Sequence, residues 1–181
     1  GYIDYETIII ESTKLLQEKP YVRECISAKY PWLLIDEYQD LGRPLHEMVL
    51  SLIDHTNIKF FAVGDPDQSI YGFQGAVPDY LRELAERADV QKIVLRNNYR
   101  SNQDIIDGSE LVLNQQRGYV AKTRESENAV YKFIEVNEGL ENQIQYFVKN
   151  IVPRLVEAKI PYEEIAVLVG NNAECNSIAM S

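Results

Sequence analysis

Hydrophobic residues recur along this chain in two patterns that alternate. In the first pattern apolar side chains return every three or four positions, the spacing of one face of an α-helix. In residues 44–54, for example, Leu45, Met48, Val49 and Leu52 share such a face. This spacing predicts helices over residues 3–29, with a second helix beginning at Pro20, and over 44–54, 78–88, 102–115 and 139–157.

The second pattern consists of short apolar runs between these helices. Trp32 to Ile35 is one such run, and Asp36 and Glu37 end it abruptly, which is typical of a buried parallel strand. Similar runs predict strands over residues 32–35, 58–63, 90–95, 129–136 and 165–169, and the polar stretch 115–128 predicts an exposed loop. Strands alternating with helices indicate an α/β fold with mainly parallel sheets flanked by helices, in which ligands bind at the carboxyl ends of strands.

Length and charge narrow the classes of protein. The 181 residues allow one large or two small domains at about 100–200 residues per domain. A composition that is 45% hydrophobic and 25% charged excludes a disordered tail. The 28 acidic against 18 basic side chains give a net charge of −10, which argues against wrapping nucleic acid by bulk positive charge. We therefore expect any binding to be local.

Cysteine usage and apolar run lengths bear on location. Cys25 and Cys175 form no CxxC pair, so neither a zinc site nor a disulfide framework is indicated, and we expect a reducing cytoplasm. The apolar runs fall far below the ~20 residues that cross a bilayer, and we expect no membrane anchor. Because Gly1 is not Met and residues 176–181 resemble the start of a helix, we also expect a fragment of a longer protein.

The acid pair Asp36 and Glu37 is the first candidate for chemistry. After a buried strand, one carboxylate can hold the Mg²⁺ that bridges two phosphates while the next polarises an attacking water. Asp36 would take the metal role and Glu37 the base role. The alternative is that both acids cap the following helix and favour its positive end.

A second candidate follows the strand at residues 58–63. Asp65 and Gln68 would face the same sheet edge as the acid pair, and the amide of Gln68 suits contact with a phosphate oxygen or an ordered water. Tyr71 and Phe73 lie in a glycine-flanked loop, an arrangement that can hold single-stranded nucleic acid by base stacking. The alternative is that both rings pack under the loop as core.

A third candidate is the segment around Tyr99 and Arg100. Arg100 could reach a γ-phosphate and Tyr99 could stack on a base, whereas Ser101 or Asn102 would cap the helix that follows. The alternative for Arg100 is an ordinary surface arginine.

Two other classes of function stay open on these residues. Clustered carboxylates could build a two-metal nuclease or phosphatase; the acids concerned are Asp36, Glu37, Asp40, Asp65 and Asp67. This reading explains the acids but leaves Gln68, Tyr71, Phe73 and Arg100 without a role. The second class is a non-catalytic interaction module that keeps the fold without the motor.

Together the three segments resemble the superfamily 1 DNA helicases of the UvrD, Rep and PcrA type. Residues 36–40 are similar to the family's second motif, usually DEFQD, with Tyr38 in place of Phe. Residues 64–76 are similar to its third motif, usually GDxxQSIYxFRGA, with Gln74 in place of Arg. Residues 98–101 are similar to its fourth motif.

The resemblance implies RecA-like parallel sheets of the P-loop NTPase type in two partial motor lobes. Residues 1–92 would be the end of the first lobe and residues 93–181 the beginning of the second. It implies an ATP-dependent helicase that moves 3′-to-5′ on single-stranded DNA and unwinds duplex, with ATP and Mg²⁺ as cofactors. The expected partners are single-stranded and partially duplex DNA and the remainder of the parent chain, and exposed sheet edges predict self-association.

The resemblance also implies roles on the ATP side. Asp36 would bind Mg²⁺, Glu37 would be the catalytic base, Gln68 and Arg100 would contact the γ-phosphate, and Tyr99 would lie against the adenine.

On the DNA side it implies contacts from Tyr71, Phe73 and position 74, where Gln74 removes a positive charge. None of the nine glycines is followed by lysine, so the chain contains no GxxxxGK[ST] phosphate loop. We therefore expect ATP hydrolysis from the parent protein and none of consequence from this chain alone.

Overall fold

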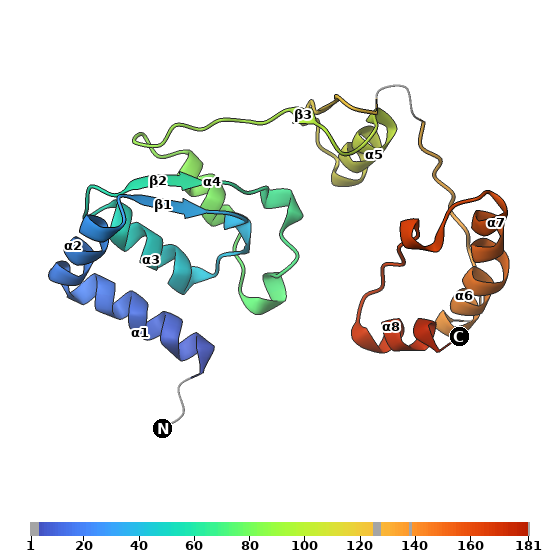
Figure 1. Cartoon of the computed structure of the whole chain (residues 1–181), viewed down its shortest axis with the longest axis horizontal. Helices are drawn as coiled ribbons and strands as arrows, with labels where there is room; N and C mark the ends of the chain where they lie inside the picture. Colours follow the sequence, from blue (N-terminus) through green and yellow to red (C-terminus); the bar gives the residue numbers. More distant parts are fainter. Residues whose placement is uncertain (1–3, 125–127, 138, 181) are drawn as a thin grey trace. The chain divides into compact units, whose positions relative to one another are not determined.

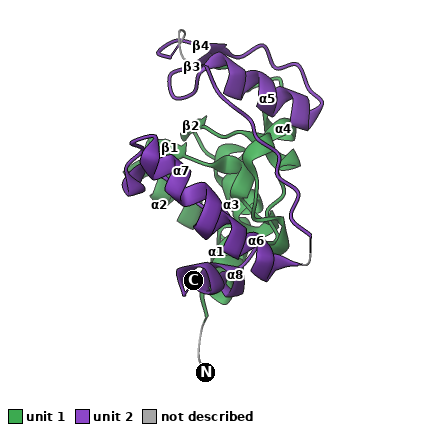
Figure 2. Ribbon diagram, turned by 90° about the vertical axis from the view of Figure 1, so that its right-hand side faces the viewer, with its two compact units in different colours: residues 1–95 green, residues 96–181 purple. Residues whose placement is uncertain are grey.

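The computed structural model describes residues 4–124, 128–137 and 139–180. The chain divides into two compact units, residues 1–95 and 96–181, which Figure 2 colours separately. Residue 3, where the first helix was predicted to begin, lies outside the described residues. Among those described, no helix is long and apolar enough to cross a membrane.

The described residues of the first unit form four α-helices, two strands and three 3₁₀ turns. Figure 1 labels the α-helices and the strands. They are α1 (Tyr5–Glu18), α2 (Pro20–Lys29), β1 (Trp32–Ile35), α3 (Arg43–Ile53), β2 (Lys59–Ala62) and α4 (Asp79–Ala85). The strands pair in parallel, with Leu33 opposite Phe60 and Ile35 opposite Ala62. Each predicted element up to residue 88 is thus confirmed in kind, with bounds shifted by a few residues.

The two-stranded sheet has one buried and one exposed face because side chains alternate along each strand. Leu33, Ile35, Phe60 and Ala62 point inward and pack on a core of Tyr38, Val49 of α3 and Leu84 of α4. Trp32, Leu34 and Phe61, on the alternate positions, are exposed. α1 packs along α3 and completes a second cluster of Leu16, Leu52 and Ile58. This packing fixes the carboxyl ends of both strands.

Tyr38 anchors the segment that follows β1. Its side chain is 0% exposed, and its hydroxyl lies 2.8 Å from His46 Nδ1 on α3. The His46 ring in turn stacks on Tyr80 of α4, with centroids 4.1 Å apart. Burial raises the pKa of Tyr38 to about 12, and burial lowers the pKa of His46. The pair is therefore neutral at physiological pH.

The second unit has two strands of two residues each and several helical segments among its described residues. They are β3 (Asn97–Asn98), α5 (Gln103–Leu113), β4 (Val120–Ala121), α6 (Leu140–Tyr146), a π-helical segment (Phe147–Ile151), α7 (Val152–Glu157) and α8 (Asn172–Ala179). β3 and β4 pair in parallel. The predicted cap of α5 is confirmed at Asn102, whose side chain accepts a hydrogen bond from the Ile105 N–H at 3.0 Å.

Three predicted strands are wrong, since residues 90–95, 129–136 and 165–169 form no strand. A strand exists only where a neighbour completes its hydrogen-bond ladder, and none lies beside these segments among the described residues. Many of their apolar side chains stay in solvent instead: Phe133 is 96% exposed and Leu168 is 94% exposed.

Two further differences concern residues 115–128 and 139–157. The predicted loop contains the short strand β4. The predicted long helix is interrupted by the π-helical segment, where the Val152 N–H bonds to the Phe147 carbonyl. Pro153 follows directly and has no N–H to donate, so the regular α-helical ladder cannot continue through it.

Candidate functional site

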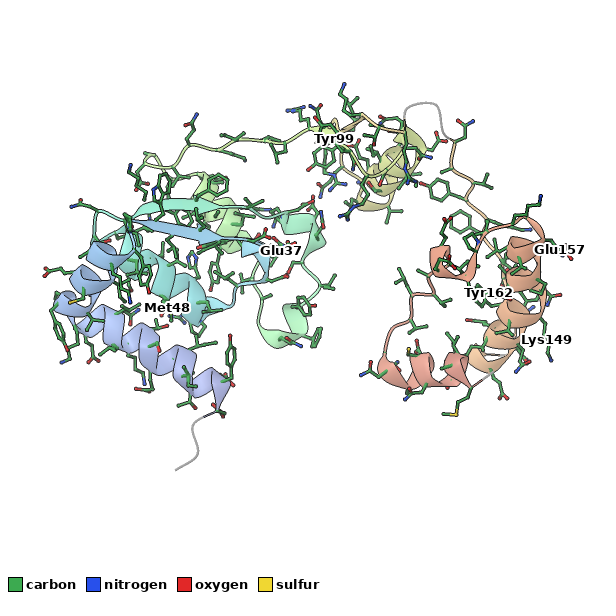
Figure 3. The ribbon with its side chains drawn as sticks, in the orientation of Figure 1. Glu37, Met48, Tyr99, Lys149, Glu157 and Tyr162 are labelled. Carbon is green, nitrogen blue, oxygen red and sulfur yellow. The ribbon has the colours of Figure 1, made fainter. Side chains whose placement is uncertain are left out.

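Asp36 and Glu37 lie where β1 ends, and both side chains are exposed (Figure 3 labels Glu37). Asp36 Oδ1 accepts a hydrogen bond from the Glu37 N–H at 3.0 Å. The Glu37 backbone is left-handed, with φ 52° and ψ 46°. For a residue with a side chain this costs on the order of 1–3 kcal/mol, and such strain clusters at functional sites.

The capping alternative finds no support at Glu37. The residue precedes the 3₁₀ turn Tyr38–Asp40, yet its side chain makes no capping hydrogen bond to that turn. Instead, Glu37 Oε2 accepts a hydrogen bond from Gln39 Nε2 at 2.7 Å. The carboxylate is therefore held by a side chain two residues further along.

Gln39 also belongs to this neighbourhood, although the sequence pattern predicts no role for it. Its side chain is 2% exposed, and its Oε1 accepts a hydrogen bond from the Asp65 N–H at 3.0 Å. The one indication in the sequence is that Gln39 is a neutral polar residue among the acidic residues of segment 36–40. Hydrophobic periodicity does not predict the direction of such a side chain. Gln39 joins the end of β1 to the end of β2.

The segment after β2 is organised around Asp65. Its Oδ1 accepts from the Asp67 N–H at 3.0 Å, and its Oδ2 accepts from Gln68 Nε2 at 2.8 Å. Arg82 of α4 bonds to both Asp67 and Asp79 and holds this turn against the helix. Gln68 is thus brought into one hydrogen-bonded series with Glu37.

The aromatic loop, residues 70–75, displays its rings to solvent. Tyr71 is 41% exposed and Phe73 is 81% exposed, with ring centroids 6.3 Å apart. The tip is closed by the Gln74 N–H, which donates to the Tyr71 carbonyl at 2.8 Å, and by Gly75 at φ 88°. The alternative that both rings are core is wrong.

The base of this loop is tied back to the segment after the acid pair. The Val77 N–H donates to the Leu41 carbonyl at 3.1 Å, and Gly42 and Ala76 form an antiparallel bridge. A Cβ on Gly42 would lie 3.0 Å from the Gly75 carbonyl oxygen, so the close approach favours glycine.

Tyr99 and Arg100 belong to the second unit, between β3 and α5. Both side chains are exposed, and the N–H groups of Arg100 and Ser101 each donate to Asn98 Oδ1 at 2.8 Å. The first unit therefore gathers Asp36, Glu37 and Gln68 in one neighbourhood, while Tyr99 and Arg100 form a separate pair.

The carboxylate of Asp36 suits Mg²⁺ as a ligand. Mg²⁺ takes oxygen donors and is commonly held by one or two carboxylates together with phosphates and water. Within the described ranges, no three His, Cys, Asp or Glu side chains converge as a metal-binding group. The acids Asp40, Asp65 and Asp67 thus do not complete the carboxylate cluster that a two-metal nuclease requires.

Two family models match this chain in succession. Residues 1–89 match the UvrD/REP helicase N-terminal domain, and residues 93–181 match the UvrD-like helicase C-terminal domain.

Individual relatives agree with these matches. The ATP-dependent DNA helicase Rep of Buchnera aphidicola is 31% identical over 94% of this chain and 27% of its own length. The ATP-dependent DNA helicase PcrA of Leuconostoc citreum is 30% identical over 99% of this chain and 24% of its own length. The Gabija protein GajB of Bacillus cereus is 37% identical over 64% of this chain and 24% of its own length. The chain thus spans about a quarter of the length of these relatives, and with both family models matched it belongs to the UvrD/Rep family of helicases.

Proposed function

We propose that this chain forms part of an ATP-dependent DNA helicase that couples ATP hydrolysis to movement along single-stranded DNA. Residues 1–92 would be the end of one RecA-like motor lobe and residues 93–181 the beginning of the next, as the order of the two matched domains suggests. The named activity of Rep and PcrA supports the reaction.

One observation carries the proposal: the acid pair and the aromatic loop are parts of one hydrogen-bonded substructure. The Tyr38 N–H donates to the Val63 carbonyl at 3.0 Å, and the Val77 N–H donates to the Leu41 carbonyl at 3.1 Å. Main-chain hydrogen bonds therefore connect the residues that suit phosphate chemistry to the residues that suit base stacking. Such a connection is required if ATP hydrolysis is to be coupled to movement along DNA.

On the ATP side, each residue has a role that its chemistry permits. Glu37 would accept the proton of the water that attacks the γ-phosphate, and Asp36 would hold Mg²⁺. When bound, Mg²⁺ supplies charge neutralisation on the phosphate oxygens. Gln68 contacts the γ-phosphate through its amide without adding charge. For the full-length protein we also propose the roles that the family resemblance implies for Tyr99, against the adenine, and for Arg100, on the γ-phosphate.

On the DNA side, the exposed rings of Tyr71 and Phe73 stack on bases of a single strand. Stacking tolerates any sequence because every base has a π-face. Gln74 can form hydrogen bonds to the strand but carries no charge. Its contact therefore adds nothing to the salt dependence of DNA affinity.

Glu37→Gln in the full-length protein tests the base assignment. The amide cannot accept a proton, so DNA-stimulated ATP turnover falls by about 10²- to 10⁴-fold while ATP binding persists. Steady-state ATPase assays with and without single-stranded DNA measure turnover, and a fluorescent ATP analogue measures binding.

Glu24→Gln, at an exposed glutamate of α2, is the matched control and keeps wild-type turnover. Wild-type turnover in Glu37→Gln refutes the base assignment. Absence of DNA-stimulated ATPase in the unaltered protein refutes the function as a whole.

A further inference from the structure

We infer that Gln39 is a positioning residue, which holds the carboxylate of Glu37 in a fixed place relative to the segment that carries Gln68. The inference deepens the proposed function and rests on it. Gln39 forms hydrogen bonds with three groups in or beside the proposed site: the Glu37 side chain, the Asp65 main chain and the Ser69 hydroxyl.

The orientation of the Gln39 amide is determined by its partners. A carboxylate can only accept, so Nε2 must face Glu37 Oε2, at 2.7 Å. A main-chain N–H can only donate, so Oε1 must face the Asp65 N–H, at 3.0 Å. An amide satisfies both neighbours at once, whereas a carboxylate or an aliphatic side chain at position 39 fails at least one.

The amide also occupies a niche that glycine leaves open. A Cβ on Gly64 would lie 2.5 Å from Gln39 Oε1, its nearest neighbour, 2.9 Å from Leu81 Cδ2 and 3.1 Å from the Tyr38 main-chain nitrogen. Contacts this short cannot be accommodated without moving the amide. Gly64 thus permits the close approach of the two strand ends, and Gln39 fills the space between them.

The hydrogen bonds continue beyond Gln39 to the residue assigned to the γ-phosphate. Asp65 receives the Gln39 contact on its N–H and holds Gln68 Nε2 with its Oδ2 at 2.8 Å. The Gln39 carbonyl also accepts a hydrogen bond from the Ser69 hydroxyl at 3.3 Å. The series Glu37, Gln39, Asp65, Gln68 therefore joins the proposed base to the proposed phosphate contact.

Fixing the base matters because Glu37 is exposed and a free glutamate side chain samples many rotamers. A charge-assisted hydrogen bond at 2.7 Å to a buried donor restricts those rotamers. Rate depends steeply on such placement, because small displacements of a reacting group cost large factors in turnover. Because Gln39 is buried, it would act through Glu37 and not on the nucleotide directly.

Two substitutions at position 39 in the full-length protein test the inference. Gln39→Ala removes both side-chain hydrogen bonds and lowers kcat for DNA-stimulated ATPase by about 10- to 100-fold, while KM for ATP changes far less. Gln39→Glu keeps the size and the acceptor for Asp65 but opposes a second carboxylate to Glu37. Its kcat relative to wild type rises as the pH is lowered, because the introduced carboxyl group regains a donor when it is protonated.

Gly64→Ala gives an independent test in which Gln39 itself is not substituted. The added Cβ displaces the Gln39 amide, so kcat falls as in Gln39→Ala. Gln17→Ala, at an exposed glutamine of α1, is the control for loss of a glutamine side chain. Thermal unfolding of each variant identifies loss of folded protein.

The outcomes separate the inference from the proposed function. Loss of kcat with KM preserved, together with the pH-dependent recovery of Gln39→Glu, supports positioning by Gln39. Wild-type kcat in Gln39→Ala, or a pH-independent ratio for Gln39→Glu in folded protein, overturns it while Glu37→Gln stays inactive. If Gln39→Ala does not fold, the pH profile of the isosteric Gln39→Glu decides alone.

Discussion

Tyr38 shows how a single departure from the family pattern is absorbed by its surroundings. Where the resembling motif usually has phenylalanine, the hydroxyl of Tyr38 lies 2.8 Å from His46 Nδ1 in the core of the first unit. The free-energy cost of burying the Tyr38 hydroxyl is offset by its hydrogen bond to His46, which is also buried and also requires a hydrogen-bond partner. The two residues form a matched polar pair.

Tyr38→Phe is expected to destabilise the protein by about 1–3 kcal/mol, because it leaves His46 Nδ1 buried without a partner. Chemical denaturation measures the free energy of unfolding. Tyr21→Phe, at an exposed tyrosine of α2, leaves that free energy unchanged.

Removing both members of the pair completes the test. Tyr38→Phe combined with His46→Phe loses less stability than the sum of the two single changes, because no orphaned polar atom remains. Additive losses would show that the hydroxyl and the imidazole do not interact.

At the scale of elements, the aromatic loop is the feature with the clearest consequence. Tyr71→Ala and Phe73→Ala in the full-length protein each weaken single-stranded DNA binding by about 1–3 kcal/mol per lost stack. Fluorescence anisotropy with a labelled oligonucleotide measures the affinity. Tyr5→Ala, at an exposed tyrosine of α1, is the control for loss of a surface ring and leaves affinity unchanged.

Because both rings are already in solvent, neither variant should alter the free energy of unfolding appreciably. Affinity equal to wild type in both variants would remove the loop from the DNA interface.

The elements of the first unit were predictable because each one's hydrophobic face has a partner in the same stretch of chain. β1 and β2 pair with each other, and α3 and α4 cover them. The runs at 129–136 and 165–169 are also rich in apolar residues, but no strand pairs with them among the described residues. The apolar pattern alone does not show whether a pairing strand is present. The local sequence determines which face of a segment is apolar. Whether the segment forms a strand depends on whether another strand lies beside it to pair with.

The candidate site was predictable only in part for a similar reason. Asp36, Glu37 and Gln68 follow apolar strands, so their place at the sheet edge could be inferred from sequence. The role of Gln39 depends on two partners, one of them 26 residues away, and on the space beside Gly64. Such a network is a property of tertiary packing and leaves no periodic trace.

At the scale of the whole molecule, exposed apolar surface sets the behaviour of the 181-residue chain. Trp32, Leu34 and Phe61 form an uncovered face on the sheet of the first unit. Among the described residues, β1 and β2 also each have one edge without a strand beside it. Uncovered apolar faces and open strand edges both favour association with another chain.

We therefore expect the isolated chain to self-associate, with a weight-average mass in sedimentation velocity that rises with concentration. Leu34→Lys places a charge on the exposed sheet face and shifts the distribution toward monomer. Leu111→Lys, at an exposed leucine of α5, is the matched control and has no such effect. A single monomeric species at all concentrations would contradict the expectation.

The double attachment of the segment between β2 and α4 has a mechanical consequence. The segment leaves the sheet beside Tyr38, extends to the ring of Phe73, and returns to Leu41 through the hydrogen bond from Val77. Because the segment is attached at both ends, tension applied at its tip is passed on to its attachment points. A strand pulling on Tyr71 and Phe73 would therefore load the backbone just beyond Glu37, at Tyr38 and Leu41.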